Sequence, residues 1–126
     1  MTDSRRRGDA YAGQFLLVDL THQTATTIPL PDWLKRDYVG GKGFGARLLH
    51  DLTTADTDPL GPENPLIFMT GPLTATAAPS MRACVVTLSP LTGIYLDSFF
   101  GGRFGPEMKY AGYDGLVVLG RAAQPT

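Results

Sequence analysis

Closely spaced glycines and prolines limit this chain to short structural elements. The 126 residues include 15 glycines and 10 prolines, about a fifth of the chain, whereas the two together make up roughly 12% of average proteins. Glycine reaches backbone conformations that other residues avoid, and proline fixes the backbone at corners. Hydrophobic residues still make up 43% of the sequence. We therefore expect a small globular fold with many tight turns.

Apolar runs between these corners predict β-strands. Gln14–Leu20 and Thr24–Leu30 are extended runs on either side of a polar turn, which is typical of a β-hairpin. Leu66–Met69 is continuously apolar, and such a run predicts a strand buried on both faces. Three further strands are expected at Arg82–Leu88, Ile94–Ser98 and Gly115–Leu119.

Helical patterns lie between the strands. Asp32 can cap a helix that runs to Tyr38 and ends at Gly40-Gly41. An apolar stripe predicts a second helix over 44–51, and a third is expected at Phe104–Ala111. Strands and helices alternate without a strict βαβ period. The predicted fold class is therefore α+β, with a mixed or antiparallel sheet and short helices.

The glycines around the second helix also fit a dinucleotide-binding pattern. Gly41-Lys42-Gly43-Phe44-Gly45-Ala46 matches G-x-G-x-x-A. That motif needs a buried strand directly before it and an acidic residue after a second strand, about 20 residues further on. Here a charged, helical segment precedes the pattern and a Pro/Asp/Gly-rich loop follows it. We interpret the glycines as a close turn between two helices instead.

Charge and hydropathy exclude several classes of partner. The net charge is −1, and the only basic run, Arg5-Arg6-Arg7, is short and flanked by acids, so no nucleic-acid partner is expected. No apolar run approaches the ~20 residues that span a bilayer, and the N-terminus lacks the apolar segment of a secretory signal. The prediction is a cytoplasmic protein without a membrane partner.

Cys84 is the only cysteine in the sequence. The chain can form no internal disulfide, and it cannot by itself hold an iron–sulfur cluster that needs several thiolates. Within the apolar run Ala83–Val86, this thiol is expected to be a small buried hydrophobe and not a nucleophile.

The segment Phe99-Phe100-Gly101-Gly102 leads from a predicted strand into a predicted helix. Paired glycines at a helix start leave backbone N–H groups uncovered beside the positive end of the helix dipole, where anions bind. Arg82, at the start of the preceding strand, can add a fork of donors suited to phosphate. These features predict a site for a phosphate-bearing cofactor.

Several separated motifs, taken in order, resemble the N-terminal domain of the aldehyde ferredoxin oxidoreductase family of tungsten-pterin enzymes. Upstream, a hairpin and a helix precede Gly40-Gly41-Lys42-Gly43. The remaining motifs are Pro62-Glu63-Asn64, Gly71-Pro72-Leu73-Thr74, Ser89-Pro90-Leu91-Thr92-Gly93 and the run from Gly101 to Asp114. We expect a flexible leader over 1–12, and the resemblance implies a partial pterin-binding domain over 13–126.

This resemblance implies cofactors and partners that the chain alone does not supply. Family members bind one tungsten, or sometimes molybdenum, through two pterin-dithiolene groups. A [4Fe-4S] cluster in later domains passes electrons to ferredoxin. The implied reaction is oxidation of an aldehyde to a carboxylic acid, although some relatives reduce aromatic thioesters.

The resemblance also implies roles for individual residues. Arg82 matches a pterin-contacting arginine, and Gly101, followed by Gly102, matches a backbone contact to the cofactor. Phe99 stands where the aldehyde-oxidising archetype has an asparagine whose main chain helps to hold a cation between the cofactor phosphates. Asp97 is the only carboxylate near this site and has no evident acidic partner, so no catalytic or metal-ligating residue is predicted.

Two functional hypotheses follow. In the first, the chain is the N-terminal part of a tungsten-pterin oxidoreductase, needs downstream domains or a subunit, and is inactive alone. In the second, it is a stand-alone pterin-binding or assembly module, or an inactive truncated fragment. The identity of the aldehyde, and the choice between tungsten and molybdenum, stay open at this point.

Overall fold

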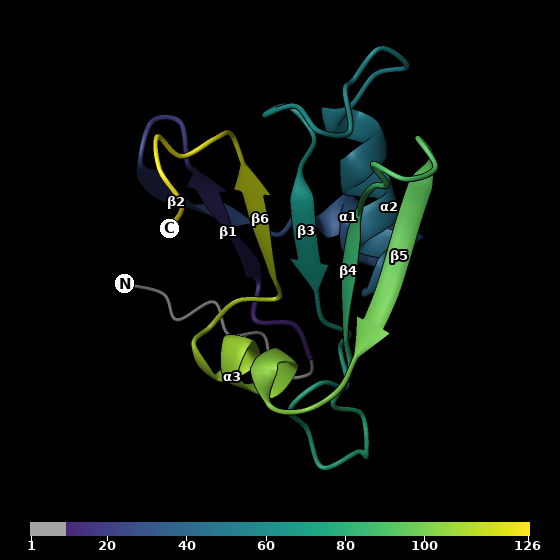
Figure 1. Cartoon of the computed structure of the whole chain (residues 1–126). Coiled ribbons are helices and arrows are strands. Elements are labelled where there is room, and N and C mark those ends of the chain that lie inside the picture. The colour runs from purple at the N-terminus through teal and green to yellow at the C-terminus, as the bar shows by residue number, and fades with distance from the viewer. Residues whose placement is uncertain (1–9) are drawn as a thin grey trace.

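A single mixed β-sheet organises the molecule, and the computed structural model describes residues 10–126 of it (Figure 1). The six strands of the described region lie in the order β2-β1-β6-β3-β4-β5. The strands are β1 (Gln14–Asp19), β2 (Thr24–Pro29), β3 (Leu66–Met69), β4 (Ala83–Leu88), β5 (Tyr95–Phe100) and β6 (Gly115–Leu119). The helices are α1 (Asp32–Asp37), α2 (Lys42–Leu52) and α3 (Phe104–Tyr110).

The strand pairing is antiparallel except between β1 and β6, which run parallel. β6 is the last strand in the sequence, yet it lies between β1 and β3 and joins the N-terminal hairpin to the rest of the sheet. The predicted α+β class with a mixed sheet and short helices is confirmed. None of the helices in residues 10–126 is long and apolar enough to cross a bilayer.

The expected elements are present, with one correction at the start of α1. Asp32 does not cap this helix, because Pro31 occupies the N-cap position and no side chain bonds the free N–H groups. Asp32 lies in the first turn, where its carboxylate is 3.1 Å from the Lys35 ammonium. At the end of α3, Gly112 takes φ +97° and its N–H donates to the Lys109 carbonyl at 2.9 Å, as expected of a C-terminal glycine.

The hydrophobic core lies between one face of the sheet and the helices α1 and α2. Gly45 of α2 faces Val86 so closely that a Cβ at residue 45 would lie 2.6 Å from a Val86 methyl carbon. A glycine at this point therefore lets the helix backbone approach β4. The fully buried large side chains of the core are Leu34, Phe44, Ile67, Met69 and Val86.

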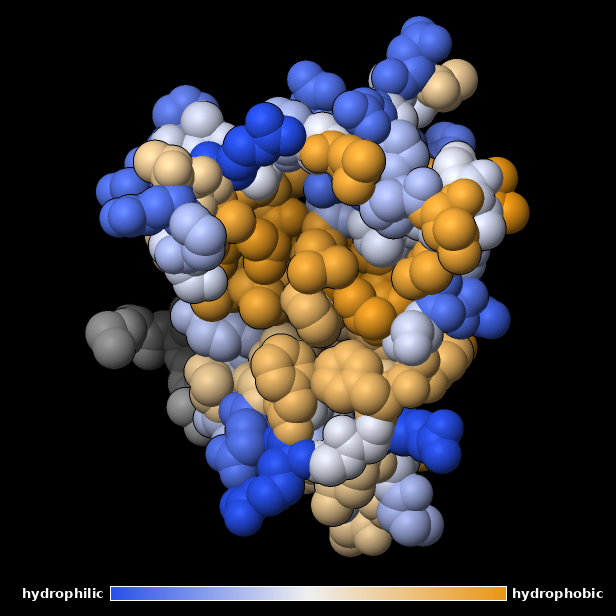
Figure 2. All heavy atoms as spheres, in the orientation of Figure 1, coloured by the Kyte–Doolittle hydropathy of each residue, from blue (hydrophilic) through white to orange (hydrophobic). Residues whose placement is uncertain are grey.

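The opposite face of the sheet is apolar as well, and among the described helices only α3 contacts it, at one end through Phe104 (Figure 2). Leu66 is 39% exposed, whereas Ile67, which points to the helices, is 0% exposed. The prediction that Leu66–Met69 is buried on both faces is therefore wrong for this chain. We call this surface the open face and define it by Leu16, Leu66, Phe68, Leu96, Phe100 and Leu116.

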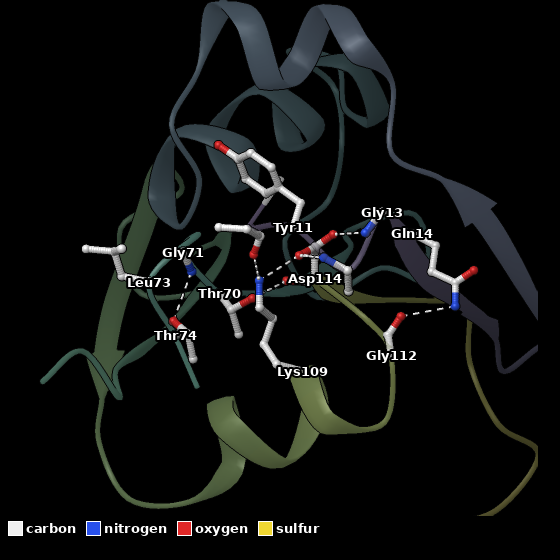
Figure 3. A network of polar contacts seen from close by, with 12 residues as sticks. Tyr11, Gly13, Gln14, Thr70, Gly71, Leu73, Thr74, Lys109, Gly112 and Asp114 are labelled. Atoms are coloured by element: carbon white, nitrogen blue, oxygen red, sulfur yellow. Dashed lines mark hydrogen bonds and ion pairs between the residues drawn. The ribbon is translucent and has the colours of Figure 1, made fainter. Parts of the chain in front are cut away.

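A buried carboxylate links the segment before β1 to α3 and to the residue before β6 (Figure 3). Asp114 is 1% exposed, and it accepts hydrogen bonds from the backbone N–H groups of Ala12 (2.8 Å) and Gly13 (2.7 Å). The Lys109 ammonium donates to the same carboxylate at 2.9 Å and to the Ala10 carbonyl at 2.9 Å. The positive charge and the two backbone donors together satisfy the buried acid.

The predicted leader over 1–12 falls mostly on residues 1–9, which lie outside the described residues. Residues 10–12 contact the domain. Besides the bonds to Asp114 and Lys109, the Tyr11 hydroxyl donates to the Val39 carbonyl at 2.6 Å. These contacts bring the chain before β1 alongside the segment that joins α1 to α2.

Replacement of Asp114 by alanine is expected to destabilise the fold strongly. The change leaves the Lys109 ammonium, whose side chain is 8% exposed, without its counterion, and it leaves two backbone donors unpaired. Removal of one partner of a buried ion pair costs about 3–5 kcal/mol. Urea unfolding followed by circular dichroism measures the change in the free energy of unfolding.

The matched control is Glu107→Ala, which removes a carboxylate from the exposed Arg103–Glu107 pair of α3. Surface pairs contribute little, so this variant is expected to unfold at the same urea concentration as the unmodified chain. Equal stabilities for Asp114→Ala and Glu107→Ala would contradict the role given to the buried carboxylate.

Candidate functional site

A cavity of about 430 Å³ opens where the start of α2 meets the end of the sheet at β4 and β5. The loop after β3 closes a third side. Its lining includes Gly40, Gly41, Lys42 and Gly43 beside α2, Gly71 and Thr74 after β3, and Arg82, Cys84 and Phe99 from the sheet.

Two glycines shape the wall at the start of α2. Gly40 and Gly41 both have positive φ, +148° and +52°, a region that disfavours other residues. A Cβ on Gly40 would lie 3.2 Å from Gly71 Cα, whereas a Cβ on Gly41 would meet no atom within 4 Å. The backbone at residue 41 is thus open on the side where a side chain would project.

Hydrogen bonds that lead to Asp114 hold the backbone of Gly41 in position. The Gly41 N–H donates to the Thr70 carbonyl at 3.0 Å. Thr70 in turn donates through its own N–H and hydroxyl to the Asp114 carbonyl, at 2.9 and 2.7 Å. The Asp114 backbone is therefore connected through Thr70 to Gly41 in the wall of the cavity.

Two cationic side chains line this cavity. Arg82 is exposed, and its guanidinium has no hydrogen-bond or ion-pair partner among residues 10–126. The Lys42 ammonium lies 3.7 Å from the Asp97 carboxylate and 5.9 Å from the centre of the Phe99 ring. The partner of the Asp97 carboxylate is a lysine, so we interpret Asp97 as a counterion for Lys42 and not as a group that transfers protons.

The structure brings together two of the four residues predicted to bind a cofactor. Arg82 and Phe99 both line the cavity. The β4–β5 register pairs Ala83 with Phe100, so Arg82 and Gly101 follow at the same end of the sheet. Gly101 and Gly102 are exposed, with no atom within 4 Å of a Cβ built on either, but they are not among the lining residues. The roles of all four stay predictions.

Sequence reasoning missed the helix that borders this cavity. It placed the anion-binding helix start at α3, whereas the start of α2 forms the wall. The signal was present in Gly40-Gly41-Lys42-Gly43, but these residues were interpreted as a turn and as one motif of the family, and not as part of a binding site. α1 precedes these glycines, not a strand, as expected when the dinucleotide motif was rejected.

Cys84 lines the cavity as a buried thiol. It is 1% exposed, and burial, reinforced by the negative charge of Asp97, raises the pKa of its thiol to about 11. The same two causes raise the pKa of Tyr95 to about 12. Residues 10–126 contain no group of three or more histidines, cysteines or acids placed to hold a metal ion.

We expect Cys84 to resist alkylation in the folded chain. With a pKa of about 11 the thiol is protonated at pH 8, and only the thiolate reacts with iodoacetamide. Mass spectrometry should show modification in 6 M guanidinium chloride and at least tenfold slower modification without denaturant. Equally fast alkylation in both conditions would contradict the burial of this thiol.

Comparison with known proteins identifies the family. The family model described as "Aldehyde ferredoxin oxidoreductase, N-terminal domain" matches residues 15–126. The chain belongs to this family. Among curated relatives, it is 41% identical over 116 residues to a tungsten-containing aldehyde ferredoxin oxidoreductase of Pyrococcus abyssi, which covers 91% of this chain.

The names of two further relatives indicate other reactions. The chain is 36% identical over 119 residues, 92% of its length, to the WOR-like subunit of an aliphatic sulfonate oxidoreductase of Pyrococcus furiosus. It also superimposes on the active-site complex BamBC of benzoyl coenzyme A reductase, solved with 1,5-dienoyl-CoA. The TM-score there is 0.89, with 37% identity over 92% of this chain.

The chain spans only a small part of these proteins. It covers 19% of the two curated relatives and 18% of the matched reductase chain. Four-fifths of each relative therefore lies outside the region of similarity.

Proposed function

We propose that this chain forms the N-terminal part of the cofactor platform of a tungsten-pterin oxidoreductase. The observation that carries the proposal is the family match over residues 15–126. Arg82 lies within this match and lines the cavity. The coarser statement, that the chain is an N-terminal domain of a family of oxidoreductases, already follows from the comparisons.

The chemistry of the cavity supports a phosphate-bearing pterin. Arg82 and Lys42 supply positive charge, and the Arg82 fork is unused by the described protein. A guanidinium can donate two parallel hydrogen bonds to a phosphate, which fixes orientation as well as charge. The open backbone at Gly41 and Gly101 leaves room for close approach of a ligand. We propose Arg82, Phe99, Gly101 and Gly102 as cofactor contacts, with Phe99 acting through its main chain.

When bound, the tungsten-pterin group would supply the two-electron redox chemistry. In the proposed reaction an aldehyde and water give a carboxylic acid, two electrons and two protons. The electrons would pass through an iron–sulfur cluster to ferredoxin. Since this chain has one cysteine, the cluster must be held by downstream domains or a separate subunit.

Similarity favours an aldehyde over the other substrates represented in the family. The identity to the tungsten-containing aldehyde enzyme is 41%, against 36% to the sulfonate enzyme and 37% to the reductase complex. The name of the aldehyde enzyme also favours tungsten over molybdenum. We propose that the complete enzyme acts in the cytoplasm.

The test is co-expression of this chain with the downstream part of its enzyme, compared with the chain alone. Aldehyde-dependent reduction of a viologen dye and tungsten content are measured on both preparations. We expect activity and tungsten only in the complex. Arg82→Ala should reduce tungsten retention about tenfold to hundredfold, because hydrogen bonds to charged groups contribute ~1.5–3 kcal/mol each.

Arg36→Ala is the matched control, since this exposed arginine pairs with Asp37 on α1 and does not line the cavity. It should retain tungsten like the unmodified chain. Turnover by the isolated chain would refute the proposed division of labour. Stoichiometric tungsten or molybdenum in the isolated chain would instead support the alternative, a stand-alone pterin-binding module.

A further inference from the structure

The cavity beside α2 offers too little positive charge for a phosphate if Arg82 acts alone. A phosphate monoester carries about −1.5 to −2 charges at pH 7, whereas a guanidinium supplies a single positive charge. Among the described residues that line the cavity, only Lys42 and Arg82 are charged. They come from different walls, because Lys42 begins α2 and Arg82 directly precedes β4. The two cations together match the charge of one phosphate group.

The Lys42 ammonium is shared, however, with a carboxylate at the border of the cavity. It lies 3.7 Å from an oxygen of Asp97 and 5.9 Å from the centre of the Phe99 ring. Asp97 and Phe99 are two residues apart on β5, so their side chains lie on the same face of the sheet. Phe99 lines the cavity, whereas Asp97 does not. The ammonium therefore lies between the cavity and a counterion outside its lining.

The contact between Lys42 and Asp97 is loose. Its length of 3.7 Å exceeds the roughly 2.7–2.9 Å of a strong charged hydrogen bond, and the Lys42 side chain is 57% exposed. Lys109 and Asp114, by contrast, approach to 2.9 Å with side chains that are 8% and 1% exposed. Exposed ion pairs contribute little to stability. The Lys42 ammonium can therefore leave Asp97 at a small free-energy cost when another anion is near.

Both charges of this pair act on the wall of the cavity. Burial is the main cause that raises the pKa of the Cys84 thiol to about 11, while Asp97 raises this pKa further and Lys42 lowers it. Asp97 also keeps a donor when Lys42 moves. Burial, together with the Asp97 charge, raises the pKa of Tyr95 to about 12, so a protonated hydroxyl stays beside the carboxylate.

We propose that Lys42 binds a phosphate group of the cofactor together with Arg82, and that Asp97 competes with this phosphate for the Lys42 ammonium. The inference rests on the proposed function, which supplies the phosphate-bearing ligand. Lysine suits this role because its ammonium is a point charge on a flexible four-carbon stem, whereas the guanidinium of Arg82 is a rigid fork. One cation thus fixes the orientation of the phosphate, and the other moves between two anions.

The test of Lys42 is a titration of the full chain with inorganic phosphate at constant ionic strength. The backbone amide shifts of Gly41 and Ala83, which line the cavity, give the dissociation constant by ¹⁵N NMR. Lys42→Gln should weaken phosphate binding about tenfold or more, because a hydrogen bond between charged groups is lost. Lys42→Arg keeps the positive charge and should retain most of the affinity. Melting temperatures verify that each variant is folded.

Asp97→Asn tests the competition. Removal of the carboxylate charge releases the Lys42 ammonium, so phosphate should bind about twofold to fivefold more tightly. In a chain that also carries Lys42→Gln, the same change should have almost no effect, because the competition acts through Lys42. An equal gain with and without Lys42 would reflect net charge alone and would overturn the role of Asp97.

The matched controls are Arg36 and Asp37, which form an exposed pair on α1 outside the lining of the cavity. Arg36→Gln removes one positive charge, as Lys42→Gln does, and Asp37→Asn removes one negative charge. Both variants should bind phosphate like the unmodified chain. The inference is overturned if Lys42→Gln leaves the phosphate affinity unchanged, or if the unmodified chain binds no phosphate at this cavity.

Tungsten content separates this inference from the proposed function. Phosphate binding that depends on Lys42, in a chain whose complex with the downstream part retains no tungsten, would contradict the proposed function and support the role of Lys42. Tungsten retention by a complex that carries Lys42→Gln, together with unchanged phosphate binding, would contradict the role of Lys42 alone.

Discussion

The buried carboxylate of Asp114 is the contact on which the arrangement of this domain depends. The Asp114 carboxylate joins the chain before β1 to the end of α3, and the backbone carbonyl of the same residue accepts a hydrogen bond from Thr70, the residue after β3. A buried acid is costly unless every partner is in place, so this contact permits one arrangement of the three segments. Thr70 extends it to Gly41, and the cavity wall is positioned by the same network as the core.

Most helices and strands could be predicted from the sequence because they depend on residues that are close together in the chain. The hairpin, the helices and the strands were located from apolar spacing and from the glycines and prolines between them. Asp32 was misplaced by one position, because Pro31 already occupies the turn that the aspartate was expected to cap. The central position of β6 has no local signal, since the pairing of β6 with β1 joins residues about a hundred positions apart.

The candidate site was predicted only in part, for the same reason. Arg82 and Phe99 were chosen from their motifs, and they line one cavity because β4 and β5 are neighbours in sequence and in the sheet. The contribution of Gly41 and Lys42 depends on the packing of α2 beside the end of β3. Spacing along the chain does not encode that contact. The exposure of Leu66 likewise depends on what covers the second face, so an apolar run alone could not decide it.

The place of β6 in the sheet has a consequence for synthesis on the ribosome. Until residues 115–119 have emerged, the β1–β2 hairpin has no strand to connect it with β3, β4 and β5. The nascent chain therefore carries two separate half-sheets, each with an unpaired edge, and such edges are prone to wrong association. Completion of the domain is then a late, nearly all-or-none event, in which one short strand closes the gap between two preformed pieces.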